Sequence, residues 1–203
     1  MSKHKDNKTE EQILKAAQSI FQTKGMEGAR MQEIADEAKI NKAMLHYYFR
    51  NKQQLFEAVF MNAFSLLAPQ LNAILNDDSS IENKVRNFTA NYINFVIMHP
   101  YLPNFIIQEL NRNPDFIVTM KKGVGFPNIK KFKAQIQLEI DSGLINQIDP
   151  EQLFIHILSL NIFPFVGAPL IKALTDVNEQ SYLEIMEARK NDVADFIINA
   201  IKK

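Results

Sequence analysis

Apolar residues recur at spacings of three and four along most of this chain, and glycine and proline rarely interrupt them. Only six glycines and eight prolines occur among 203 residues, and strict alternation over strand-length runs is scarce. Spacings of three and four place apolar side chains on one face of a helix, whereas alternation would indicate strands. The pattern therefore predicts an all-α fold.

The composition excludes several classes of protein. Hydrophobic residues make up 46% and charged residues 23%, so a disordered or collagen-like chain is excluded. The absence of cysteine rules out a disulfide framework, a zinc finger, an iron–sulfur cluster and thiol catalysis. It also suits a reducing compartment, and we expect a cytoplasmic protein without a metal or cofactor. Lys+Arg and Asp+Glu both number 23, so any nucleic-acid site must be local.

Three short helices are predicted within the first fifty residues. The first covers about residues 10–24 and ends at Gly25, and the second covers about 30–38. The third begins near Asn41, a favourable N-cap, and ends near residue 48. Because only a tight turn fits between the last two, they form a helix-turn-helix, a unit that places its second helix in a DNA groove.

The outer face of this unit is polar and cationic. The expected inward residues are Ile34, Ala35, Ala38, Ile40, Leu45 and Phe49. Lysine and arginine cluster at Lys39, Lys42, Arg50 and Lys52, and no acidic residue occurs between Lys39 and Glu57. Such a cluster can neutralise DNA phosphates, and Tyr47 and Tyr48 can donate hydrogen bonds to them.

Residues from about 10 to 60 resemble the TetR family of bacterial repressors. The resemblance rests on Ile13-x-x-Ala16-Ala17-x-x-x-Phe21-x-x-x-Gly25, on Glu33-Ile34-Ala35-x-x-Ala38, and on Leu45-His46-Tyr47-Tyr48-Phe49-x-Asn51-Lys52-x-x-Leu55. It implies a DNA-binding domain at residues 1–50 and a helical domain at residues 51–203 that binds an effector and dimerises. It also implies release from an operator when the effector binds.

The sequence departs from the family's usual pattern in three places, one of them a pair of residues. Ala29 and Arg30 stand where a threonine pair or threonine-serine is usual, so the second helix lacks its side-chain cap, at a cost of about 1 kcal/mol. Lys39 replaces the usual glycine of the turn, and a positive φ there would cost about 1 kcal/mol. His46 replaces a tyrosine.

We expect a set of side chains from this unit to contact double-stranded DNA. Lys42 is expected to donate to guanine, Ala43 and Met44 to touch a thymine methyl, and Lys52 to anchor a phosphate. The alternative for each is a solvated or packing side chain. The full set is Arg30, Lys39, Lys42, Ala43, Met44, His46, Tyr47, Tyr48 and Lys52.

The rest of the chain is expected to bind a small-molecule effector. Residues 58–76, 87–108 and 153–171 carry no charged side chain, which favours a neutral or largely apolar molecule. The alternative is a plain aromatic core. The candidate lining residues are Phe64, Phe88, Asn91, Tyr92, Phe95, Phe105, Gln108, Met120, Phe132 and His156. Prolines and polar residues interrupt 153–171, so we expect a buried helix followed by a turn and no membrane span.

Two helices, at about 150–163 and 177–202, fit the dimerising pair of the family. Two such pairs form a four-helix bundle, and the resulting homodimer would read two half-sites of a pseudo-palindrome. The interface candidates are Leu153, Ile157, Leu160, Ile185, Met186, Val193, Phe196 and Ile197.

Two other classes of protein fit the sequence less well. An enzyme is disfavoured because the chain lacks a phosphate loop, a Rossmann glycine fingerprint, an HExxH motif and a nucleophile elbow. A helical adaptor that binds protein would leave the cationic run at residues 39–52 unexplained.

Overall fold

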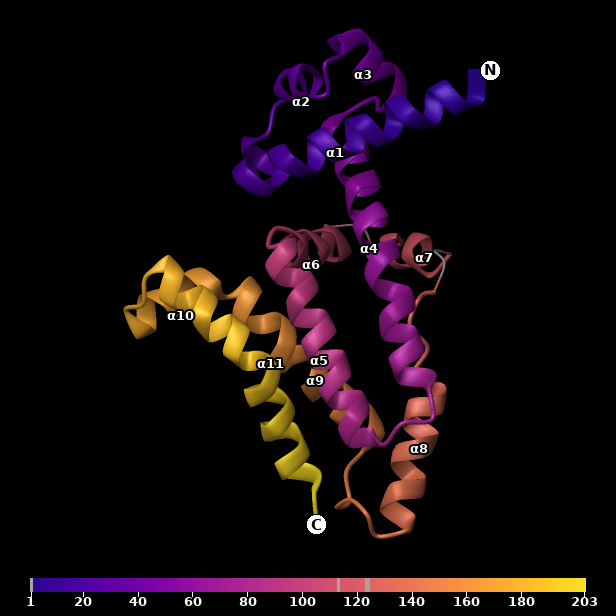
Figure 1. The fold of residues 1–203 in the computed structure, drawn as a ribbon, viewed down its shortest axis with the longest axis vertical. Helices are drawn as coiled ribbons and strands as arrows, with labels where there is room; N and C mark the ends of the chain where they lie inside the picture. The colour runs from indigo at the N-terminus through magenta and orange to yellow at the C-terminus, as the bar shows by residue number, and fades with distance from the viewer. Residues whose placement is uncertain (1, 113, 123–124) are drawn as a thin grey trace. The chain divides into compact units, whose positions relative to one another are not determined.

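The computed structural model describes residues 2–112, 114–122 and 125–203 and divides into two compact units. We call them the head, Met1–Phe64, and the body, Ser65–Lys203. Within the described residues every regular element is a helix, and the β pairing is one isolated bridge between Ile145 and Lys202 (Figure 1). The predicted all-α fold is confirmed. The division falls inside the fourth helix, whereas the prediction placed it at residue 50.

The head contains helices α1 (Ser2–Gly28), α2 (Met31–Glu37), α3 (Lys42–Tyr48) and the first part of α4 (Lys52–Asn76). Helix α1 bends at Gly25, where φ is 66°, as the expected helix stop requires. It begins at Ser2 rather than near residue 10. The predicted inward residues are buried, apart from half-buried Ile40. The rings of Phe21 and Phe56, 4.5 Å apart, pack α1 against α4.

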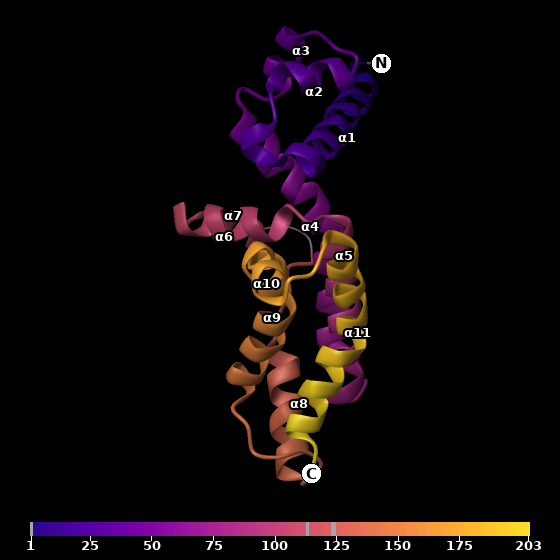
Figure 2. The same cartoon turned by 90° about the vertical axis from the view of Figure 1, so that its left-hand side faces the viewer.

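The body contains the remaining helices. They are α5 (Ile81–Met98), α6 (Leu102–Arg112), α7 (Phe116–Lys121), α8 (Lys130–Asp141), α9 (Pro150–Val166), α10 (Ala168–Thr175) and α11 (Glu179–Ile201). Helices α5 and α11 pack against each other, and α9 packs against α5, α8 and α11 (Figure 2). Their shared core is aliphatic and aromatic, and it includes Val85, Phe88, Phe132, Ile136 and Ile197.

Helix α4 buries apolar side chains in each unit. Leu55, Phe56 and Val59 are buried in the head, and Leu71 and Leu75 are buried in the body. Among the described helices, α4 alone is long and apolar enough by itself to cross a membrane, with 39% of its most apolar window buried. Its two sets of core contacts account for the apolar composition.

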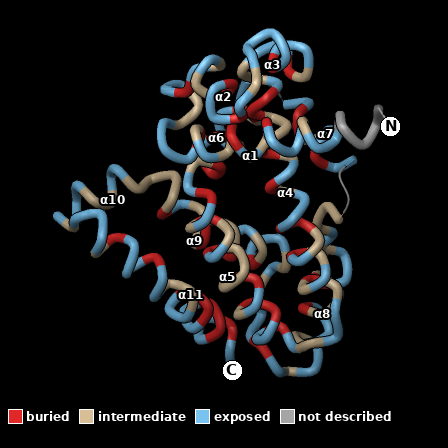
Figure 3. The backbone as a smooth tube through the Cα atoms, turned by 45° about the horizontal axis from the view of Figure 1, so that its top comes forward, coloured by how far each residue is buried: buried red, intermediate tan, exposed pale blue. Residues whose placement is uncertain are grey.

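Segment 153–171 forms a bent pair of helices. Asp149 caps α9 by accepting a hydrogen bond of 2.8 Å from the Gln152 N–H, and Pro150 occupies its first turn. The chain turns at Gly167 by 74° into α10, which has no buried residue (Figure 3). The expected helix and turn are present, but α9 buries one face only, through Leu153, Ile157, Asn161 and Pro164, and a short exposed helix follows the turn.

Candidate nucleic-acid interface

A tight turn with an unusual central residue joins α2 to α3. The Lys39 N–H donates to the Asp36 carbonyl and the Ile40 N–H donates to the Ala35 carbonyl, both at 3.0 Å. This pair of bonds is a Schellman motif, whose left-handed position is usually glycine. Lys39 occupies that position with φ 54°, so the expected strain of about 1 kcal/mol is present. The Lys39 side chain is exposed.

Helix α3 is held from one side and leaves the other side open to solvent. The Asn41 side chain accepts a hydrogen bond of 2.7 Å from the Met44 N–H, which confirms the predicted cap. Leu45 is completely buried and anchors the helix in the head. The turn and helix expose a surface that we call the α3 face, formed by Lys39, Lys42, Ala43, Met44, His46 and Tyr47.

Two aromatic side chains stand at the end of the α3 face. Tyr47 is 81% exposed, and its ring meets the half-buried ring of Tyr48 edge to face at 5.4 Å. An exposed phenol can reach a phosphate oxygen while the ring pair holds its orientation. His46 is also exposed, and its Nδ1 atom lies 3.2 Å from the Arg50 carbonyl oxygen.

Arg30 stands at the N-cap of α2 without forming a cap. Its backbone is extended and its side chain accepts no hydrogen bond from the first turn, as the sequence predicted. The guanidinium is exposed and available to a phosphate.

The Lys24 ammonium, 3.0 Å from Glu33, holds the pKa of the Glu33 carboxyl below its ordinary value. The acid in the first turn of α2 is therefore ionised and paired at neutral pH.

Lys52 takes a position that the sequence did not suggest. Its ammonium donates to the carbonyl oxygens of Glu27, at 3.2 Å, and Ala29, at 3.3 Å, and the residue is half-buried. These bonds tie the start of α4 to the end of α1 and to the residue that follows it. An ammonium has three N–H donors, so one is left for a phosphate. Its contact with DNA stays a prediction.

The expected pocket residues do not gather around one space. Phe88, Tyr92 and Phe132 form an aromatic cluster with Phe154 in the body core, with ring centroids 6.0 to 6.2 Å apart. Burial raises the pKa of Tyr92. The other candidates are distributed as follows: Phe105 and Met120 are buried, Phe95 packs on His99 at 4.6 Å, Asn91 is half-buried, and Phe64 stacks on Phe60 in the head.

Two of the expected pocket residues, Gln108 and His156, are exposed. The buried face of α9 runs through Leu153, Ile157 and Asn161, and His156 lies outside it. Asn161 is completely buried and donates to the Thr89 hydroxyl at 3.3 Å. Its Oδ1 is buried without a hydrogen-bond partner.

A cleft of about 240 Å³ lies elsewhere in the body. Its lining residues are Ser80, Glu82, Glu139, Leu144, Ile145, Ile198, Ile201 and Lys202. None of the predicted pocket residues contributes to it. Within the described residues, no three acidic or histidine side chains are grouped closely enough to hold a metal ion.

Most of the predicted dimer contacts belong to the chain's own core. Leu153, Ile157, Met186, Val193 and Ile197 are each at most 4% exposed, so a second chain cannot contact them. Leu160 is half-buried, and Ile185 and Phe196 are exposed. Helices α9 and α11 each carry apolar residues on two faces, and spacing alone does not show which face packs internally.

A recognition helix exposed on a three-helix head, followed by an all-α body, defines a DNA-binding transcriptional regulator of the helix-turn-helix class. Residues 13–59 match the family described as bacterial regulatory proteins, tetR family. This match, together with the relatives below, supports a TetR family transcriptional regulator.

Curated relatives and solved structures agree with this. The transcriptional repressor NicS of Pseudomonas putida is 28% identical over 51% of this chain and 49% of its own length, so the match spans about half of that protein. The regulator RutR of Escherichia coli is 24% identical over 80% of this chain and 76% of its own. Both are transcriptional regulators rather than enzymes.

Two solved structures share the fold over almost the whole chain. FadR of Bacillus subtilis, solved with stearoyl-CoA, gives a TM-score of 0.66 at 16% identity and covers 94% of this chain and 98% of its own. The hemolysin II regulator HlyIIR gives 0.59 at 22% identity, covering 97% and 98%.

Proposed function

We propose that this chain is a dimeric repressor that binds a pseudo-palindromic operator and is released by a small, largely apolar effector. The observation that carries the proposal is the α3 face, where Lys39 and Lys42 are exposed beside Met44 and Tyr47. Its cations can neutralise phosphates, and its first turn can reach base edges. NicS and IcaR of Staphylococcus epidermidis are named a repressor and a negative regulator, which supports repression.

The individual DNA contacts follow from position. Lys42, Ala43 and Met44 open α3, so they read base edges. Contacts to the DNA phosphates fix the orientation of the head on the duplex, and they come from Arg30, Lys39, His46, Tyr47, Tyr48 and the remaining N–H of Lys52.

The dimer forms through the outward faces of α9 and α11. Ile155 and Phe163 on α9 are 51% and 54% exposed, and Ile185 and Phe196 on α11 are 42% and 66% exposed. Large apolar side chains gathered on two neighbouring helices are typical of a protein interface. A second copy that pairs the same two helices would complete a four-helix bundle with two-fold symmetry.

The effector acts by binding more tightly to a dimer whose two heads are spaced incorrectly for the operator than to one whose heads fit it. A preference of about 100-fold between the two states is equivalent to about 2.7 kcal/mol and would release much of the DNA. The largely apolar interior of the body favours an apolar molecule, and FadR, which shares the fold, was solved in complex with stearoyl-CoA, a molecule with a long apolar chain. We further propose a cytoplasmic location without membrane insertion.

Binding to a duplex selected from a random library tests the proposal. We expect a clear sequence preference, and an affinity that falls steeply as salt rises from about 50 to 200 mM. The duplex should contain two related half-sites about one helical turn apart. Equal, weak binding to every sequence would contradict a role as an operator-binding repressor.

A further inference from the structure

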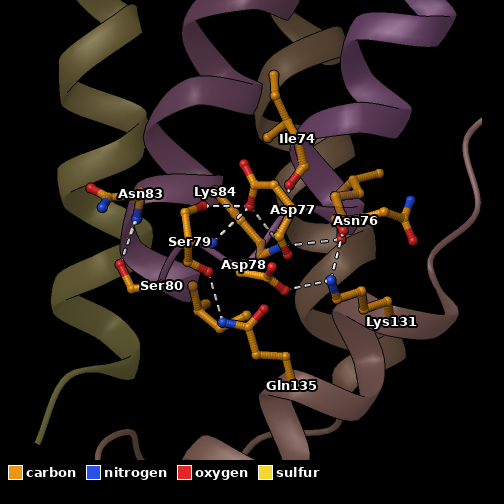
Figure 4. A network of polar contacts seen from close by, with 12 residues as sticks. Ile74, Asn76, Asp77, Asp78, Ser79, Ser80, Asn83, Lys84, Lys131 and Gln135 are labelled. Carbon is orange, nitrogen blue, oxygen red and sulfur yellow. Dashed lines mark hydrogen bonds and ion pairs between the residues drawn. The ribbon is translucent and has the colours of Figure 1, made fainter.

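The C-terminal end of α4 is closed by ammonium groups from two other helices. The last carbonyl groups of a helix have no partner within it. Lys84 of α5 donates to the carbonyl oxygens of Ile74, at 3.2 Å, Leu75, at 3.3 Å, and Asp77, at 2.8 Å (Figure 4). Lys131 of α8 donates to the Asn76 carbonyl at 2.9 Å. The end of α4 is thus attached to both α5 and α8.

Lys84 is completely buried, which is rare for a lysine. Its charge is compensated by the Asp77 carboxylate at 3.0 Å and by the negative end of the α4 dipole. The Ser79 hydroxyl donates to Asp77 at 2.6 Å, and this bond, with the Lys84 ammonium, lowers the pKa of Asp77 to about 2. Asp77 therefore remains ionised at neutral pH.

Further bonds connect α4 and its following turn to α8 and the segment before it. The Asn128 N–H donates to the Asn72 side chain at 2.9 Å, and the Asn76 side chain donates to the Asn128 carbonyl at 2.9 Å. The Gln135 side chain of α8 donates to the Ser79 carbonyl at 2.8 Å. The end of α4 and the start of α8 are thereby joined as one unit.

Stability alone does not require a buried ammonium at this place. Replacing buried charged groups by well-packed apolar residues is often neutral or stabilising. An apolar residue would fill the space, but it would not attach α5 to three carbonyl oxygens in a fixed direction. A charge-assisted bond to several acceptors restricts orientation, which dispersion contacts do not.

We infer that Lys84 is a positioning residue that fixes the body end of α4 to α5 and α8. Helix α4 is shared by the head and the body. A rearrangement of α5 or α8 therefore reaches the head as a motion of α4, and DNA binding at the head reaches α8 by the same route. This inference rests on the proposed binding of DNA by the head.

Hydrogen–deuterium exchange of the full-length protein, with and without a duplex selected from a random library, tests the inference. Lys84→Met keeps the aliphatic stem and removes the donors. Arg86→Met is the matched control, because Arg86 lies on the same helix but pairs at the surface with Glu82 and Asp195. We expect the duplex to slow exchange in α3 for all three proteins. Exchange in α8 should change by about threefold or more in the unaltered protein and the control, and remain unchanged in Lys84→Met.

An α8 response that persists in Lys84→Met would overturn the inference, and so would its absence from the unaltered protein. Lys131→Met provides a second variant if Lys84→Met does not fold, because Lys131 is about half exposed. Lys131→Met should reduce the change that the duplex causes in α8 exchange, while α3 remains protected. A change in α8 as large as in the unaltered protein would contradict the proposed attachment of α4 to α8. Failure of the duplex to protect α3 in the unaltered protein would instead contradict DNA binding itself.

Discussion

The Arg189 guanidinium donates a hydrogen bond of 2.6 Å to the Leu160 carbonyl oxygen. That carbonyl has no helical partner, because Pro164, four residues further along α9, lacks an N–H. The Tyr182 hydroxyl donates to the Pro164 carbonyl, just before the chain turns into α10. Two side chains of α11 therefore complete the backbone bonding of α9 where proline interrupts it.

Arg189→Met should lower the free energy of unfolding by about 1–3 kcal/mol, because it leaves the Leu160 carbonyl without its donor. Chemical denaturation at a fixed protein concentration measures the change. Lys190→Met is the control, since Lys190 lies on the same helix and pairs only locally with Glu187. Equal losses from both variants would show that the bond to Leu160 has no particular importance.

Lys39→Gly should separate stability from DNA binding. Glycine relieves the left-handed strain and should raise the free energy of unfolding by about 1 kcal/mol. Loss of one phosphate contact should weaken DNA binding and reduce the slope of log affinity against log salt by about 0.9. Lys39→Asn tolerates the same backbone without the charge and should also weaken binding. An unaltered salt slope in both variants would remove Lys39 from the interface.

Lys42→Ala and Arg30→Ala should affect DNA binding differently. Lys42 opens the recognition helix, so its loss should cost about 1–3 kcal/mol at one base position and relax the preference there. Arg30 stands at the N-cap of α2, and its loss should weaken binding to all sequences alike. Affinities for the selected duplex and its single-base variants distinguish the two. A uniform effect of Lys42→Ala would contradict its role in base reading.

Phe196→Asp should convert the proposed dimer into a monomer. Phe196 is 66% exposed on α11, and an aspartate would put an unpaired charge into the interface. Sedimentation at micromolar concentration measures the oligomeric state. Leu138→Asp is the control, because Leu138 is 67% exposed on α8, outside the proposed face. A dimer that survives Phe196→Asp would require a different interface.

Asp77→Asn should flatten the loss of stability in acid. The pKa of Asp77 is lowered to about 2 from 3.8, so the unfolded chain binds more protons between these values. Stability therefore rises with pH across this window and is lost as pH falls from about 4 to 2. The slope of unfolding free energy against pH should be shallower in the variant. An unchanged slope would mean that Asp77 is not paired in the folded protein.

Local chemistry made much of the head predictable from sequence. Gly25 marks a helix bend, Asn41 caps α3, and the inward residues from Ile34 to Phe49 are buried, apart from half-buried Ile40. Caps and turns depend on bonds within a few residues, so the sequence contains their causes. The cationic run that ends at Lys52 was also predictable from the sequence. The hydrogen bonds from Lys52 to the carbonyl groups of Glu27 and Ala29 were not, because these residues lie far from Lys52 in the sequence.

The sequence by itself determined that the chain is helical, where most helices start and stop, and which helix of the head is the recognition helix. Only the tertiary structure decided which apolar face each body helix turns inward. Leu153 and Ile157 lie in the chain's own core, whereas Ile155 and Phe163 lie outside. It also decided that Lys84, an ordinary helix lysine in sequence, is completely enclosed at the end of α4. Spacing defines a face of a helix, but only the packing of distant segments determines what that face meets.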